Sequence, residues 1–360
     1  MKNAVLLELG GSHAECLHTQ IHYLAANGYD VHLICDKRVW SQIEEKHLLK
    51  GFQVHNLPDK NIFRQLISIF RIHFYVRRHR ISHLIINTLE STIIRNSFLV
   101  SFPKKLNCTA ILHNAQKLVS GKSLHRIVGK KVKKFFVLSE YIRRNFQSQT
   151  HFKLSVFYPI YFPKFEFVTL EKSPGEIWIT IPGSVEPQRR DYAGLLKELM
   201  KKTLHANIKL IFLGHLDVVK YPEIDNLLRQ TNLWGTQIIC FTNFVENNLF
   251  HSYIAQSDLI LPLMHPSANG KNDFYGDSRI SGSFNLSFAY KIPMLIEQSM
   301  AMWDDLQGSC FFYQKEDIIH CINSFANRKD EIENLHRSMK INDKYDENLL
   351  QKHYIEFIES

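Results

Sequence analysis

The sequence predicts an α/β protein built from two doubly wound parallel-sheet domains in series. A length of 360 residues suits two domains of about 150–180 residues each. Short apolar runs alternate with stretches of helical periodicity, which is typical of βαβ units. The alternation is interrupted once, by Pro159, Pro163, Pro174 and Gly175, and then restarts. We therefore predict an N-terminal domain over 1–162, a linker over 163–176, a C-terminal domain over 177–340 and a final helical segment over 341–360.

The apolar runs have the length and character of strands in a parallel sheet. Such strands are buried on both faces, so they are continuous apolar runs rather than alternating ones. In the first half, the expected strands cover 4–9, 30–35, 83–87, 109–113 and 134–138, and the expected helices cover 13–27 and 62–80. In the second half, the expected strands cover 177–181, 208–213, 238–241, 259–263 and 294–297, and the expected helices cover 191–202, 247–256, 283–290, 316–327, 329–340 and 347–358.

Composition excludes several classes of protein. Hydrophobic residues make up 45% and charged residues 22%, which indicates an ordinary globular chain rather than a disordered one. The six cysteines are dispersed without a CxxC pair, so we expect reduced thiols and neither a disulfide framework nor a metal site. The N-terminus resembles a strand rather than a signal peptide, and no apolar run reaches about 18 residues. We expect a cytoplasmic location, and the net charge of +9 favours anionic partners.

Candidate site residues follow the predicted strands, because ligands of open parallel sheets bind at the carboxyl ends of the strands. After the first strand, Gly10 and Gly11 permit close backbone approach of an anion to the next helix N-terminus. His13 and Glu15 lie in the first turn of that helix. These polar residues either face a ligand or only cap the helix. His113 directly follows a later strand of the same half and is a further candidate.

Two loops of the second half have the composition of a phosphate site. The first carries Gly183, Arg189 and Arg190 between a strand and a helix, and arginine suits phosphate oxygens. A solvated basic turn is the alternative. The second loop carries Arg279 and the run Ser281, Gly282 and Ser283 at the start of a helix, which forms an anion-binding nest.

The order of elements resembles the GT-B glycosyltransferases, particularly the retaining family 4 enzymes. The strongest similarity lies in FVENNLFHSYIAQSDL at 244–259 and SFAYKIPMLI at 287–296. The resemblance implies two Rossmann-like domains facing across a cleft, with the last helix crossing back to the N-terminal domain. It implies that Gly10 and Gly11 approach the donor diphosphate and that His113 contacts the donor sugar. It also implies that Arg190 and Arg189 bind the diphosphate, that Val245 lies beside the nucleobase, and that the Ser281–Ser283 amides bind phosphate.

One departure from the family 4 pattern concerns catalysis. That pattern places two glutamates seven residues apart near the donor loop, whereas Leu286 occupies the second position here. The sequence therefore leaves a retaining or an inverting outcome open. We expect a UDP- or GDP-sugar as the substrate, no cofactor, and leaving-group stabilisation by Arg190, Arg279 and the helix N-terminus. In an inverting reaction His13 or Glu15 would be the base.

The acceptor is expected to be a glycan or a lipid-linked saccharide. The predicted helix at 62–80 combines apolar and basic residues, and Lys130, Lys131, Lys133 and Lys134 form a second basic cluster. These residues either contact an anionic membrane at its inner face or belong to an amphipathic helix and a solvated surface. A sugar-nucleotide epimerase and a catalytically silent partner subunit remain alternatives. No nucleic-acid-binding motif interleaves the basic residues with aromatic ones, so nucleic acid is not expected as a partner.

Overall fold

The computed structural model describes residues 2–10, 13–54, 62–89, 91–121, 126–265 and 278–360, without the side chains of 52–54, 62 and 64. These residues form two units, each built on one parallel sheet. The first unit comprises Met1–Pro163, Asp277–Ile280 and Asp346–Ser360, and the second comprises Lys164–Gly276 and Ser281–Tyr345. The two-domain α/β prediction is confirmed. Among the described residues, no helix has the length and apolar character needed to cross a bilayer.

The first unit contains a seven-stranded sheet in the order β3-β2-β1-β4-β5-β6-β7. Every pair of neighbouring strands is parallel, so each connection returns over one face of the sheet. The strands are β1 (Lys2–Glu8), β2 (Tyr29–Asp36), β3 (Leu49–Val54), β4 (His83–Ile86), β5 (Asn107–Ile111), β6 (Lys134–Val137) and β7 (Lys153–Val156).

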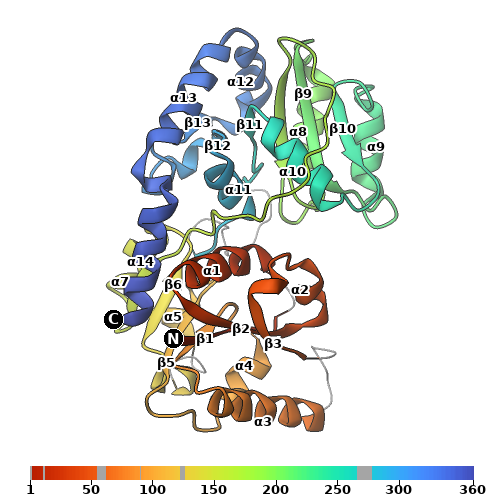
Figure 1. Ribbon diagram of the computed structural model, residues 1–360. Helices are drawn as coiled ribbons and strands as arrows, with labels where there is room; N and C mark the ends of the chain where they lie inside the picture. The colour runs from red at the N-terminus through yellow and green to blue at the C-terminus, as the bar shows by residue number, and fades with distance from the viewer. Residues whose placement is uncertain (1, 11–12, 55–61, 90, 122–125, 266–277) are drawn as a thin grey trace. The chain divides into compact units, whose positions relative to one another are not determined.

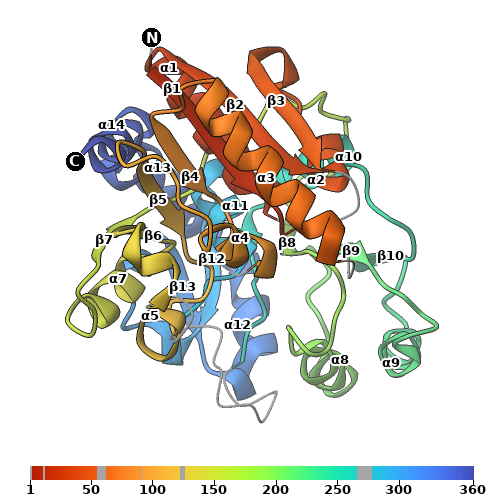
Figure 2. The same ribbon diagram turned by 90° about the horizontal axis from the view of Figure 1, so that it is seen from below.

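Helices cover both faces of this sheet (Figure 1). Successive side chains of β1 point to opposite faces of the sheet. Val5 and Leu7 belong to one apolar cluster, and Ala4 and Leu6 belong to another on the opposite face. The first cluster is completed by α3 (Ile62–Arg78), α4 (Thr92–Ser97), α5 (Lys117–Ser120) and α7 (Glu140–Gln147), and the second by α1 (Ala14–Ala26), α2 (Lys37–Gln42) and α14 (Glu347–Glu359). Figure 2 shows α3 in front of β1 and β2, on the face opposite α1.

The C-terminal helix α14 belongs to the first unit. Tyr354, Phe357 and Ile358 are buried in its second apolar cluster, and the Tyr354 ring stacks on Phe136 with 5.1 Å between centroids. The end of the helix is held by Lys134 of β6, whose Nζ donates to the carbonyl oxygens of Ile358 and Ser360 at 2.8 and 3.0 Å. Burial lowers the pKa of Lys134 to about 8. Lys134 is therefore not part of an exposed basic cluster, and that expectation was wrong.

The second unit contains a six-stranded parallel sheet in the order β10-β9-β8-β11-β12-β13. Its strands are β8 (Ile177–Pro182), β9 (Ile208–His215), β10 (Ile238–Phe241), β11 (Leu259–Ile260), β12 (Met294–Glu297) and β13 (Cys310–Tyr313). Its helices are α8 (Tyr192–Lys201), α9 (Pro222–Gln230), α10 (Asn247–Gln256), α11 (Gly282–Tyr290), α12 (Ile318–Ser324) and α13 (Lys329–Ile341). Between β7 and β8 the chain forms neither helix nor strand.

The central strands were predicted, but three of the four edge strands were not. β3 and β7 are the edges of the first sheet, and β13 is an edge of the second. An edge strand pairs on one side only and tolerates polar residues, so β3 (LKGFQV) and β7 (KLSV) lack the continuous apolar run used for prediction. This reason does not apply to β13 (CFFY), which is apolar and was missed. Residues 278–280 also differ from expectation, because they pack on the first unit: Ser278 O accepts from Ala115 N at 2.9 Å, and Ile280 contacts both apolar clusters.

We predict that Phe357→Ala destabilises the first unit by about 3 kcal/mol, because it leaves a cavity beside Phe136. Leu349→Ala, on an exposed position of the same helix, is the matched control and should change stability by less than about 0.5 kcal/mol. Urea unfolding of both variants measures the difference. Equal midpoints for the two variants would show that the α14 packing contributes nothing to stability.

Candidate functional site

Polar residues gather at the carboxyl edge of the first sheet, where β1, β4 and β5 end side by side. Glu8 is the last residue of β1, and Asn87 and Thr88 directly follow β4. His113 is the second residue after the end of β5. Because these three strands are neighbours in the sheet, the residues that follow them meet at one place. The arrangement is a direct consequence of the strand order.

The Glu8 carboxyl is the centre of this cluster and is fully buried. Its Oε1 accepts from Gly10 N at 2.5 Å, and its Oε2 accepts from Asn87 Nδ2 at 2.7 Å and from Thr88 Oγ1 at 2.5 Å. Burial raises the pKa of Glu8 to about 7, against the opposing effect of these hydrogen bonds. The carboxyl thus joins the loop after β1 to the loop after β4.

Hydrogen bonds extend from Glu8 to the C-terminal helix. The Asn87 side chain donates to Glu8 and accepts from Gln20 Nε2 at 2.7 Å, and Gln20 Oε1 accepts from Tyr354 OH at 3.1 Å. These side chains are buried where water does not reach them, so their polar groups need hydrogen-bond partners within the protein. Helices α1 and α14 are therefore linked to the site through polar side chains.

The predicted glycine turn approaches this carboxyl closely. A Cβ on Gly10 would lie 3.0 Å from Glu8 Oε1 and 3.2 Å from Thr88 Cγ2, so a larger residue would displace one of them. Gly11 lies outside the described residues. His13, the residue before α1, has a left-handed backbone with φ of 66°, which is unfavourable for a residue with a side chain. The Asn87 side chain holds this conformation by donating to His13 O at 3.1 Å.

The structure brings together the three predicted catalytic residues. His13 Nδ1 lies 3.0 Å from Glu15 Oε1, and the His13 and His113 rings stack at 3.6 Å between centroids with 17° between their planes. A carboxylate only accepts, so the proton of neutral His13 is on Nδ1 and its lone pair is on Nε2. His113 Nε2 lies 2.9 Å from Asn87 O, so neutral His113 carries its proton on Nε2.

The two imidazoles of this cluster differ in their ability to accept a proton. Burial and the neighbouring His13 lower the pKa of His113 to about 3, so His113 is neutral near pH 7. The pKa of Glu15 is lowered as well, because its hydrogen bond and charge attraction to His13 outweigh the burial that opposes ionisation. The pair of Glu15 carboxylate and His13 imidazole can accept a proton at His13 Nε2, and Glu15 would stabilise the resulting imidazolium.

A second candidate site lies at the carboxyl edge of the other sheet. The Arg190 guanidinium donates to Pro182 O at 2.6 Å and lies 3.4 Å from Ser283 Oγ. Gly183, with φ of 98°, makes room for it, because a Cβ there would lie 3.1 Å from the guanidinium. Ser281 caps α11 by accepting from Ser283 N, and Gly282 is the first helical residue. An arginine beside a helix N-terminus is an arrangement that binds anions.

The backbone that carries Arg190 is fixed by Asp191. Its carboxylate accepts from Gly194 N at 2.9 Å at the start of α8, and it contacts His265 Nδ1 at 2.8 Å and Lys315 Nζ at 3.0 Å. The hydrogen bond to His265 is the largest influence lowering the pKa of Asp191, with burial opposing it. His265 also contacts Tyr313 OH at 2.8 Å through Nε2, which completes the buried cluster.

Two other predicted donor-binding residues of the second unit are not brought to Arg190. Arg189 is exposed and pairs with Glu186 at 3.1 Å. Val245 is buried in the loop between β10 and α10, two strands away from β8 in the sheet. Arg279 lies in the short segment that packs on the first unit.

Sequence reasoning missed Glu8, Asn87 and Thr88 in the first unit and the Asp191–His265 contact in the second. Asn87 and Thr88 are polar residues directly after an apolar strand, which is the same signal that identified His113. Glu8 is a charged residue at the end of an apolar run. Nothing in the sequence relates Asp191 to His265, because the two are 74 positions apart.

No protein-family model matches the sequence, and a search of curated proteins finds no significant match. The structure, however, is similar to several solved structures over almost its whole length. A glycosyltransferase from Rickettsia africae has a TM-score of 0.66 at 13% identity, covering 99% of this chain and 98% of that one. HepE from Anabaena, in complex with UDP, has a TM-score of 0.67 at 14% identity and covers 99% of both chains.

A protein from Listeria monocytogenes described as a UDP-N-acetylglucosamine 2-epimerase is also similar, with a TM-score of 0.65 at 11% identity, covering 99% of this chain and 95% of that one. At these identities the likeness concerns the fold, and the specific resemblance to family 4 stays a prediction. Two parallel sheets of seven and six strands, each covered by helices on both faces, match these neighbours. The chain therefore has the GT-B fold of two Rossmann-like domains.

Proposed function

We propose that this protein is a glycosyltransferase that moves a sugar from a nucleotide-sugar donor to a hydroxyl of its acceptor. The observation that carries the proposal is the His13–Glu15 pair at the carboxyl edge of β1, stacked on neutral His113. The GT-B fold supports it, since similar structures include a glycosyltransferase from Rickettsia africae and a lipopolysaccharide galactosyltransferase, WaaB. HepE is described in complex with UDP and with UDP and glucose, so UDP-sugars are the first donors to test, followed by GDP-sugars.

In this proposal His13 is the general base. The acceptor hydroxyl gives its proton to His13 Nε2 while its oxygen forms a bond to the anomeric carbon, and the bond from that carbon to the diphosphate oxygen breaks. The electron pair leaves with the nucleoside diphosphate. Glu15 stabilises the imidazolium that forms, and His113 contacts the donor sugar. A base acting on the acceptor in this way corresponds to inversion at the anomeric carbon.

The leaving diphosphate gains negative charge, which positive groups of the chain would stabilise. We assign this role to Arg190 and the amides of Ser281–Ser283 at the α11 N-terminus, with Arg279 as a further cation. Gly10 and Gly11 would approach the diphosphate, and Val245 would lie beside the nucleobase. No metal is needed in this scheme, and nucleotide binding with and without magnesium tests that point.

We propose a glycan or a lipid-linked saccharide as the acceptor, used in polysaccharide or glycoconjugate synthesis in the cytoplasm. Peripheral contact with the inner face of a membrane would bring the enzyme to a lipid-linked acceptor. The surface that supports this contact is separate from the site and lies on α3.

The deciding experiment is calorimetric titration with UDP, GDP, CMP and ADP, followed by turnover with the sugar nucleotides of the base that binds. Acceptor-dependent release of nucleoside diphosphate would support a transferase. Conversion of the sugar nucleotide to its epimer without an acceptor would support an epimerase, the function described for the Listeria neighbour. If no nucleotide binds at millimolar concentration, the proposal is wrong and the silent partner subunit becomes the favoured alternative.

The role of His13 predicts a loss of turnover without a loss of donor binding. His13→Gln should lower kcat by about 10²–10⁴-fold, because the base is removed while the donor contacts remain. His22→Gln is the control on the same helix: His22 stacks on Tyr161 and pairs with Glu347, away from the strand ends. It should retain wild-type kcat. Unchanged kcat in His13→Gln would eliminate His13 as the base.

The adjacent arginines provide a matched pair for the diphosphate site. Arg190→Gln should weaken nucleoside diphosphate binding by about 10- to 100-fold, because it removes a charge-assisted hydrogen bond beside the α11 N-terminus. Arg189→Gln should change the Kd by less than about twofold, because Arg189 is exposed and pairs with Glu186. Calorimetry measures both constants. Equal weakening in the two variants would indicate a general effect of net charge.

Glu8 predicts a pH dependence of stability. Its pKa is raised from 4.5 to about 7 on folding, so the folded state binds this proton more tightly than the unfolded chain does. The contribution of this protonated group to stability is therefore full below about pH 4.5, falls by about 3 kcal/mol in total between about pH 4.5 and about pH 7, and changes no further at higher pH. Glu8→Gln cannot ionise. The Tm of this variant minus the Tm of wild type should therefore be larger at about pH 8 than at about pH 5. A Tm difference that is the same at both pH values would contradict the raised pKa.

A further inference from the structure

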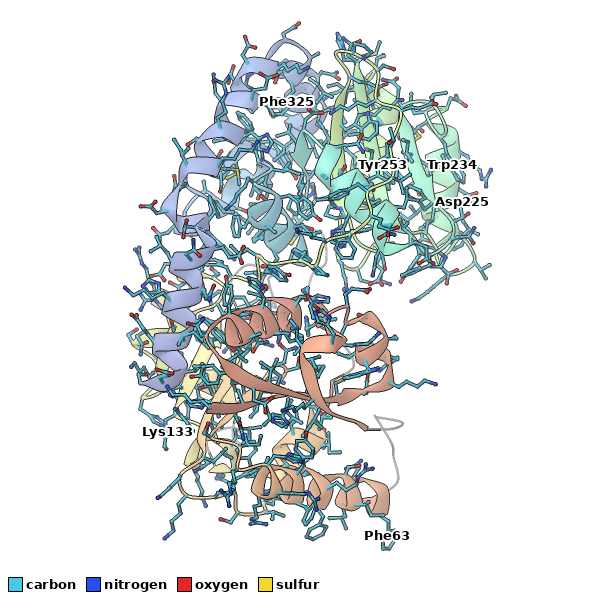
Figure 3. The ribbon with its side chains drawn as sticks, in the orientation of Figure 1. Phe63, Lys133, Asp225, Trp234, Tyr253 and Phe325 are labelled. Carbon is cyan, nitrogen blue, oxygen red and sulfur yellow. The ribbon has the colours of Figure 1, made fainter. Side chains whose placement is uncertain are left out.

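A row of large apolar side chains is exposed along α3 in the first unit. The row consists of five residues of this helix: Phe63 (77% exposed), Leu66 (44%), Ile67 (58%), Phe70 (62%) and Phe74 (63%). Figure 3 shows Phe63 at the outer end of α3, away from the sheet. Single exposed apolar residues are ordinary, but a contiguous row of this size marks an interaction surface.

The row is a helical stripe that adjoins the one packed on the sheet. Counted from Phe63, its members stand at i, i+3, i+4, i+7 and i+11, which at about 100° per residue keeps them within about 100° of arc. The buried stripe is formed by Ile69, Ile72, His73 and Val76. Helix α3 therefore has one wide apolar arc, one side of which is buried on the sheet while the other side is exposed.

Other contacts hold α3 in place without the exposed row. Ile69, Ile72 and Val76 belong to the apolar cluster under the sheet. His73 Nε2 lies 2.9 Å from Ser97 O, its ring stacks on Phe102 at 3.9 Å, and Arg77 donates to Ser101 O at 3.0 Å. The exposed row can therefore be changed without removing what anchors the helix.

The stretch of chain that contains α3 is strongly basic. From residue 60 to residue 139 the chain carries sixteen lysine and arginine residues and one acidic residue, Glu90, a net charge of +15. The whole chain has +9, so all other residues together carry −6. Helix α3 contains four arginines, Arg64, Arg71, Arg77 and Arg78, and no carboxylate. On the helical wheel Arg71 and Arg78 lie along one border of the exposed row, at about 60–80° from Phe63.

Three lysines of the basic cluster predicted at 130–134 are engaged by backbone carbonyl groups. Lys134 is buried against the C-terminus, and Lys133 Nζ donates to Gly129 O. Lys131 Nζ donates to Pro103 O and Lys104 O at 3.0 and 3.1 Å. The cations that border the apolar row on α3 itself are Arg71 and Arg78.

We propose that this face of α3 inserts into the surface of an anionic lipid bilayer, with the apolar row in the acyl region and the arginines at the headgroups. An apolar stripe bordered by cations on a helix without acidic residues is the pattern of an interfacial helix. A second copy of the chain is disfavoured as the occupant, because pairing this face with itself would bring like charges together. The proposal concerns a surface of the first unit alone and does not rest on the proposed function.

Vesicle flotation of the full-length protein tests the proposal. The protein should float with vesicles of equimolar phosphatidylcholine and phosphatidylglycerol and remain largely unbound with phosphatidylcholine alone. Phe70→Ser/Phe74→Ser should reduce the bound fraction on anionic vesicles at least about tenfold, because the apolar contribution is lost. Arg71→Gln/Arg78→Gln should reduce binding to anionic vesicles and remove much of its salt dependence.

Phe167→Ser/Ile341→Ser is the matched control, because it removes two exposed apolar residues from the second unit, and it should float like wild type. An unchanged Tm for each variant shows that the fold is retained. The proposal is overturned if wild type floats with neither vesicle or if Phe70→Ser/Phe74→Ser floats as well as wild type. It is also overturned if light scattering shows a wild-type dimer that this variant converts to a monomer, since the occupant would then be a second copy.

Discussion

Both sheets of this protein are purely parallel, and a parallel sheet must be covered on both faces by the helices that connect its strands. This constraint explains the continuous apolar strands, the two apolar clusters of the first unit and the return of α14 to complete one of them. It also places the carboxyl ends of all strands at one edge of each sheet. The polar residues that follow the strands, such as Asn87 and His113, consequently become neighbours.

Within the first unit, the buried carboxyl of Glu8 organises this edge. Burial opposes its ionisation while three donors favour it, and the outcome is a pKa near neutrality. Through Asn87 the same network holds the left-handed backbone of His13 and, through Gln20, reaches Tyr354 of α14. The position of His13 beside His113 thus depends on contacts with several elements rather than on the local sequence of the loop.

The second unit shows why neighbouring residues of one type can differ in role. Arg189 and Arg190 are equivalent in composition, but only Arg190 turns toward the end of β8, where Gly183 leaves space for it. Asp191 fixes the following helix through His265 and Lys315. The sequence predicted the basic turn from its two arginines, and it predicted the α11 N-terminus from the run Ser281, Gly282 and Ser283. The segment that carries Arg279 belongs to the first unit, where Ile280 contacts both apolar clusters.

The sequence by itself determined the α/β class, the series of two domains and most central strands, because apolar periodicity follows from burial on two faces. It also indicated that His13, Glu15 and His113 follow strands at the carboxyl edge of the sheet, where ligands of parallel sheets bind. Only the tertiary structure decided the edge strands, the buried role of Glu8 and Lys134, and which apolar stripe of α3 faces the sheet. Those features depend on partners distant in sequence, and a side chain's burial is a property of the packed fold rather than of its own segment.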